Sequence, residues 1–143
     1  MRLARRKILA SILLAVTLSS CGGGGGGSSG TDGPIIALPM RTLSWEPPTQ
    51  YADNLAIVDP TRELKEYWIY MKSDNTAFTL TDTHVIVPAV DPITNQLVSS
   101  YDLRLAATVF SLKPGITYFV TMQAVSADDI QSDFSDPVID VMF

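Results

Sequence analysis

The sequence predicts an all-β Greek-key sandwich, from a strand, a turn and the placement of proline. Residues 118–124 alternate between apolar and mixed positions, as a half-buried strand requires. The preceding Pro114-Gly115 pair suits a tight turn, and a tyrosine directly after such a turn is typical of a tyrosine corner, whose hydroxyl bonds back to the turn. All nine prolines fall in turns, at strand ends or on candidate edges. The core face of this strand would carry Tyr118, Val120, Met122 and Ala124.

The remaining strands are predicted in chain order from alternation and breakers. A short apolar run at 35–38 stops at Pro39, and residues 40–45 place Leu43 and Trp45 on one face. Residues 50–64 form a long connection whose apolar patch is expected to fold over one end of the sandwich. Later strand candidates are 66–71 with Tyr67, Ile69 and Met71 inward, 84–87, 101–112 with Val109 and Leu112 inward, and 133–143. The segment between 72 and 100 is expected to form an enlarged hairpin.

The first twenty residues have the organisation of a targeting segment. A basic stretch precedes an eleven-residue apolar run at 8–18, which is too short to span a bilayer. The chain therefore divides into a leader at 1–20, a Gly/Ser-rich tether at 21–33 and one domain at 34–143. The basic residues of the leader are Arg2, Arg5, Arg6 and Lys7.

The leader ends in Leu18-Ser19-Ser20-Cys21, which resembles a bacterial lipobox. That resemblance implies cleavage before Cys21 and covalent fatty acylation, such as palmitate, on this single cysteine. The alternative is an ordinary secretory signal that leaves a free thiol. Because Gly22 is not the aspartate associated with inner-membrane retention, the resemblance points to a cell-envelope protein of the outer membrane.

Charge and cysteine content limit the partners of the processed chain. Residues 21–143 hold six Lys and Arg against fifteen Asp and Glu, a formal charge of −9. An acidic surface argues against nucleic acid and anionic lipid as partners. Without a second cysteine there is no internal disulfide, so the core must supply the stability.

Two segments resemble the fibronectin type III family. Leu43-Ser44-Trp45-Glu46-Pro47-Pro48 is similar to its second strand, whose tryptophan crosses the core, and residues 112–125 are similar to its tyrosine corner and following strand. An immunoglobulin domain would carry a cysteine where Val120 stands. The resemblance implies a fibronectin type III-like, immunoglobulin-like sandwich over residues 41–143. Its structural core would contain Trp45, Tyr67, Ile69, Leu112, Tyr118 and Val120.

No catalytic constellation is predicted. His84 is the only histidine, Cys21 is assigned to a lipid, and no Gly-rich phosphate loop follows a strand. Aspartates near the loop at 126–132 lack the spacing of a calcium loop, so a solvated acidic loop is the preferred interpretation. The expectation is a non-enzyme without metal or cofactor, apart from the covalent lipid on Cys21.

A binding surface is predicted on the outer face of the sheet. Trp68 and Tyr70 point away from the core on one strand, and Phe119 does so on its neighbour. The alternative is that these aromatics pair across strands under the hairpin without binding anything. The other candidate surface is the loop, with Asp128, Asp129 and Ile130. We expect an interaction or assembly module for an envelope or extracellular protein, with carbohydrate binding or an inert spacer as alternatives.

Overall fold

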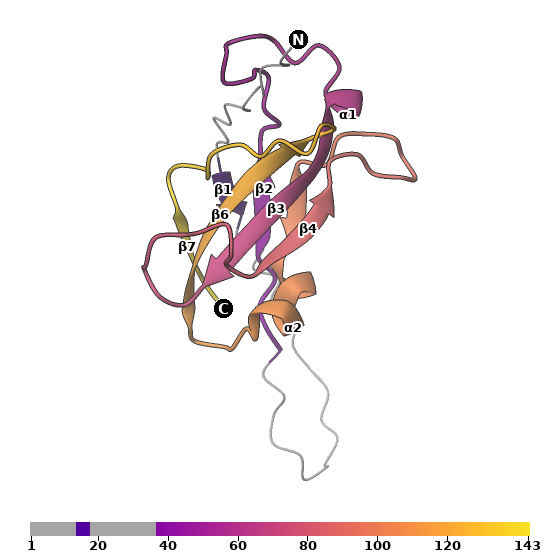
Figure 1. Cartoon of the computed structure of the whole chain (residues 1–143). Helices are drawn as coiled ribbons and strands as arrows, with labels where there is room; N and C mark the ends of the chain where they lie inside the picture. Colours follow the sequence, from indigo (N-terminus) through magenta and orange to yellow (C-terminus); the bar gives the residue numbers. More distant parts are fainter. Residues whose placement is uncertain (1–13, 18–36) are drawn as a thin grey trace.

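The computed structural model describes residues 14–17 and 37–143, which form two antiparallel sheets (Figure 1). One sheet has the order β1-β2-β5, from β1 (Leu14–Thr17), β2 (Thr42–Trp45) and β5 (Ser100–Asp102). The other has the order β4-β3-β6-β7, from β4 (His84–Pro88), β3 (Leu64–Lys72), β6 (Thr117–Ser126) and β7 (Ile139–Met142). The short helices are α1 (Pro60–Glu63), the 3-10 helix η1 (Leu103–Ala106) and α2 (Ala107–Phe110). An all-β sandwich is confirmed.

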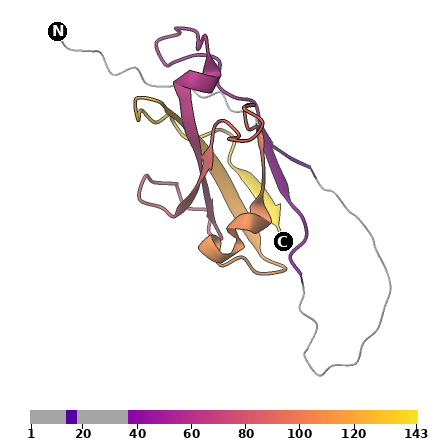
Figure 2. The ribbon, with the colours of Figure 1, turned by 90° about the vertical axis from the view of Figure 1, so that its right-hand side faces the viewer.

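The centre of the molecule is the long ladder between β3 and β6. Tyr67 lies opposite Ala124 and Ile69 opposite Met122, and all four side chains are buried between the sheets. The alternate residues of both strands therefore face outward, since side chains on a strand alternate between faces. Figure 2 shows the two layers from the side.

The core is built on aromatic contacts. Trp45 packs edge-on against Tyr67 with ring centroids 5.0 Å apart, and both are almost fully buried. Five of the six predicted core residues are buried, and Leu112 is half-buried against the same cluster. Burial of large aromatic side chains provides much of the stability of a domain without disulfides.

The tyrosine corner is confirmed. The Tyr118 hydroxyl accepts a hydrogen bond from the Lys113 backbone N–H at 3.0 Å and donates to the Ser111 carbonyl at 3.4 Å. Gly115 has φ +76°, a left-handed conformation that glycine adopts without strain. The C-terminal Phe143 packs edge-on against Tyr118 at 5.9 Å. The turn before β6 is thus fixed by Tyr118 and Phe143.

The strand predicted at 101–112 is wrong beyond Asp102. The chain turns instead into η1 and α2, and Val109, expected inward, is 49% exposed. The Asp102 carboxylate accepts the Arg104 backbone N–H at 3.0 Å, which starts the helical turn. Leu, Arg and Ala are strong helix formers, and this local preference prevails over weak alternation.

The first strand is also not where the sequence placed it. Ala37 and Leu38, from the predicted strand at 35–38, lie outside any strand, and β1 fills the place beside β2 with Val16 opposite Leu43. The apolar run of the leader and the predicted strand at 35–38 are both short and apolar, so either can pair with β2 through backbone hydrogen bonds. The predictions for residues 1–13 and 18–36, including Cys21 and the tether, lie outside the described residues.

Candidate functional site

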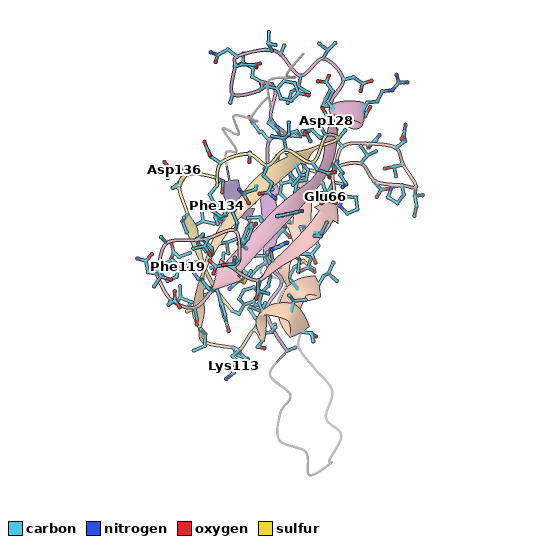
Figure 3. The ribbon with its side chains drawn as sticks, viewed as in Figure 1. Glu66, Lys113, Phe119, Asp128, Phe134 and Asp136 are labelled. Carbon is cyan, nitrogen blue, oxygen red and sulfur yellow. The ribbon has the colours of Figure 1, made fainter. Side chains whose placement is uncertain are left out.

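The outer face of the four-stranded sheet carries the three aromatic residues among the predicted binding residues. The strand register sets Ile86, Trp68 and Gln123 in one row, and His84, Tyr70 and Thr121 in the next. Phe119 lies opposite Lys72 at the far end of this face (Figure 3). The three predicted aromatics therefore share one face, as expected, but they do not form one exposed patch.

Tyr70 corrects the prediction of an exposed aromatic row, because its side chain is fully buried. Phe134 packs edge-on against its ring at 5.1 Å, Phe78 lies at 6.4 Å, and His84 at 4.9 Å. The hydroxyl donates to Gln123 Oε1 at 2.8 Å. Burial raises the pKa of this phenol to about 12. Tyr70 is thus inaccessible to a ligand in this structure.

The segment before β7 covers Tyr70 because serine hydroxyls hold it against β6. Ser132 and Ser135 accept the backbone N–H groups of Ala124 and Met122 through their Oγ atoms at 2.9 and 3.1 Å. Their own backbone N–H groups donate to the carbonyls of the same two residues, each at 2.8 Å. Phe134, between the two serines, is thereby placed over the sheet (Figure 3).

The 73–83 segment covers the other side of Tyr70. Lys72 lies over the Phe78 ring, 4.5 Å from its centroid, and contacts the Asp82 carboxylate at 3.4 Å. Asp82 also accepts the Thr79 backbone N–H at 2.9 Å, and this hydrogen bond lowers the pKa of its carboxyl group. Part of the predicted enlarged hairpin, the 73–83 segment, therefore packs over the outer face of the sheet through these contacts.

The other half of the face remains open around Trp68, which is half-buried. Its ring stacks on His84 with centroids 4.5 Å apart and planes 14° apart, and Nε1 donates to Glu66 Oε1 at 2.8 Å. Beside it on the edge strand β4, Ile86 is 56% exposed. The indole is therefore held in one orientation next to an accessible aliphatic side chain.

An open hollow of about 420 Å³ lies next to Tyr70. At its floor the Gln123 amide is already used, since Nε2 donates to the Ser132 carbonyl at 2.6 Å and Oε1 accepts from Tyr70. Its lining combines amide, hydroxyl and carboxylate groups with the apolar side chains of Leu80 and Phe134. The lining residues are Leu80, Gln123, Gln131, Ser132, Asp133 and Phe134.

The acidic loop is separated from Phe119. Ser126 lies opposite Leu64 and Phe119 opposite Lys72, so the two sites lie at opposite ends of β3, roughly 25 Å apart at the rise of a strand. Asp128 is exposed (Figure 3), and the Asp129 carboxylate contacts Lys65 Nζ at 2.5 Å. That contact raises the pKa of Lys65. Among the three predicted aromatic residues, Trp68 lies nearest this end of the sheet.

Sequence reasoning missed Phe78, Phe134 and His84 as parts of the outer aromatic cluster. His84 was expected to be an ordinary strand residue, and it begins β4. Within the described residues there is no group of three or more His, Cys, Asp or Glu that could hold a metal ion. The same part of the chain contains no helix long and apolar enough to cross a membrane. The spacing of Ser132 and Ser135 around Phe134 is the sequence signal that could have indicated that this segment packs over Tyr70.

No protein-family model and no curated protein sequence matches this chain.

Proposed function

We propose that the chain is a non-enzymatic, lipid-anchored protein of the cell envelope that presents one fibronectin type III-like sandwich for protein–protein interaction or assembly. The support for the family is the tryptophan on β2, the tyrosine corner before β6, and the four-stranded sheet β4-β3-β6-β7. The support for the anchor is the lipobox resemblance at Cys21.

Anchoring follows from the proposed lipidation. A single acyl chain binds a membrane only marginally, whereas the two or three chains of a bacterial lipoprotein hold stably. A Gly/Ser tether of about a dozen residues spans roughly 20 Å. The sandwich would therefore stand just clear of the membrane, and Gly22 after the cysteine favours the outer membrane.

The observation that carries the interaction role is the open half of the outer face. Trp68 is fixed by its stack on His84 and its bond to Glu66, so a partner would lose little side-chain entropy by contacting it. Tryptophan is enriched among residues that dominate binding energy, above all when apolar neighbours such as Ile86 adjoin it. A rigid aromatic beside an exposed aliphatic suits a protein partner.

Carbohydrate binding is the second candidate. The hollow beside Tyr70 offers side-chain hydrogen-bonding groups of Gln131 and Asp133, which favour a hydroxyl-rich ligand. Against this, His84 covers one face of the Trp68 ring, so only the other face is left for stacking on a sugar. An inert spacer would bind neither class.

The test is cross-linking and pull-down of the lipidated protein from its native envelope. Trp68→Ala should reduce recovery of a specific partner about thirtyfold, as expected for a hot spot worth about 2 kcal/mol. A chain with residues 127–131 scrambled, which keeps the buried Ser126 and Ser132, locates any contribution of the loop. Leu105→Ala is the matched control, because Leu105 is 72% exposed on η1. Equal recovery from all variants would contradict a binding role for this face, and a glycan array then tests the carbohydrate alternative.

A further inference from the structure

The outer edge of β4 is an open strand edge without a charged residue. β4 is the terminal strand of the four-stranded sheet and reads His84-Val85-Ile86-Val87-Pro88. Natural edge strands usually carry charges that prevent pairing with another chain. At the opposite end of the sheet, β7 carries Asp140, and the Arg41 side chain donates to its Met142 carbonyl at 2.8 Å. Among the residues that the structure describes, β4 is protected by its short length and its terminal proline.

The register shows which backbone groups of β4 point outward. Ala89 donates its N–H to the Lys65 carbonyl at 3.0 Å, toward β3. Along an antiparallel strand, alternate residues direct their backbone N–H and C=O groups to the same neighbour. The backbone groups of Val85 and Val87 therefore also point toward β3. His84 and Ile86 therefore direct their N–H and C=O groups to the open side, where Pro88 adds only a carbonyl. Within residues 37–143 no hydrogen bond reaches these outward groups.

We propose that this edge pairs with the same edge of a second copy, antiparallel about Ile86. The inference rests on the proposed function, because it names the partner of the assembly module. In this register Ile86 exchanges two hydrogen bonds with Ile86 of the second copy. Each His84 N–H donates to the Pro88 carbonyl opposite, so the missing proline N–H leaves only one acceptor unpaired on each copy. A twofold axis then relates identical surfaces, as in most homodimers.

The side chains around the edge also fit a second copy. Trp68 and Ile86 form one row on the outer face, so pairing would join two such rows into one apolar band across the dimer. The processed chain carries a charge of −9, and β4 offers a neutral strip where two acidic molecules can approach. The 91–97 segment extends past β4 on its open side (Figures 1 and 2) and carries Ile93, which is 91% exposed. In the proposed dimer, the 91–97 segment would contact the second copy outside the paired strands.

Disulfide trapping in the envelope tests the proposal with the lipidated full chain. In Ile86→Cys, the paired Cα atoms would lie about 5.5 Å apart, within reach of a disulfide. The matched control is His84→Cys, on the same strand and face, whose twin would be displaced four residues, roughly 14 Å along the strand. We expect a reducible dimer at least about tenfold more abundant for Ile86→Cys than for His84→Cys or Leu105→Cys.

A second experiment guards against a poorly folded Ile86→Cys variant. Co-expression of His84→Cys with Pro88→Cys should give a disulfide-linked pair that neither variant forms alone. Equal trapping of His84→Cys and Ile86→Cys, or no trapping in either experiment, would overturn the proposed pairing. If a different protein is still captured through Trp68, the interaction role stands and only the second copy as partner is excluded. A reducible dimer of the unmodified chain would show that Cys21 carries a free thiol, and the anchor would then be wrong.

Discussion

Aromatic residues on the two faces of the four-stranded sheet are buried from solvent in different ways. On the inner face, Tyr67 packs against Trp45 from the other sheet and has no contact with solvent. On the outer face, Tyr70 is just as buried, but loops carrying Phe78 and Phe134 cover it. Trp68, one row away, is left half open. The partner sheet covers the inner face completely, whereas the loops cover only part of the outer face and leave Trp68 partly accessible.

Substitution of a core aromatic should destabilise the domain much more than substitution of an aromatic on the outer face. Trp45→Ala and Tyr118→Ala each remove a large core aromatic and should cost roughly 3–5 kcal/mol of unfolding free energy, enough to unfold the domain. Trp68→Ala should cost about 1 kcal/mol, because it loses one ring stack and one bond at a half-open site. Urea unfolding measures all three. If Trp68→Ala unfolded the domain as the core variants do, the outer face would be core and not a binding surface.

A smaller effect distinguishes the two buried tyrosines. Tyr70→Phe leaves Gln123 Oε1 without its donor and should cost about 1–3 kcal/mol. Tyr67→Phe should be nearly neutral or stabilising, since the Tyr67 hydroxyl is buried without a hydrogen-bond partner of good geometry. Both variants retain the ring, so the comparison isolates the hydroxyl. Equal losses in thermal unfolding would contradict the hydrogen-bond assignment.

The same tyrosines set the alkaline limit of stability. Burial is the main cause that raises the pKa of both Tyr67 and Tyr70 to about 12, whereas an unfolded tyrosine titrates near 10. Folding therefore favours the protonated phenols. Their contribution to the free energy of unfolding is fully present below about pH 10 and is lost as the pH rises toward 12. Because Tyr67→Phe removes one of these groups, its loss of stability across this range should be smaller than that of the unmodified protein.

Local patterns in the sequence predicted the core strands well. Period-two alternation identified β2, β3 and β6, and it placed Tyr67, Ile69 and Val120 inward. The turn before Tyr118 gave the tyrosine corner because all its parts lie within a few residues. These features depend on neighbours in the chain, which the sequence displays directly.

What the sequence did not predict depends on distant contacts or on competing local preferences. Tyr70 alternates outward as expected, but Phe134 reaches it from 64 positions along the chain. The spacing of Ser132 and Ser135 is visible in the sequence, but it does not show that both hydroxyls accept hydrogen bonds from β6. At 103–110, helix propensity and the Asp102 cap outweighed an alternation that was equally compatible with a strand.

We propose that a lipid on Cys21 presents this sandwich at a membrane, and intact-mass spectrometry of the protein extracted from the envelope tests this proposal. The proposal predicts a chain that begins at Cys21, lacks residues 1–20 and carries the mass of two or three acyl chains on that residue. The leader, including the residues of β1, would then be absent from the mature domain. A chain that retains residues 1–20, or one with an unmodified Cys21, would contradict the claim.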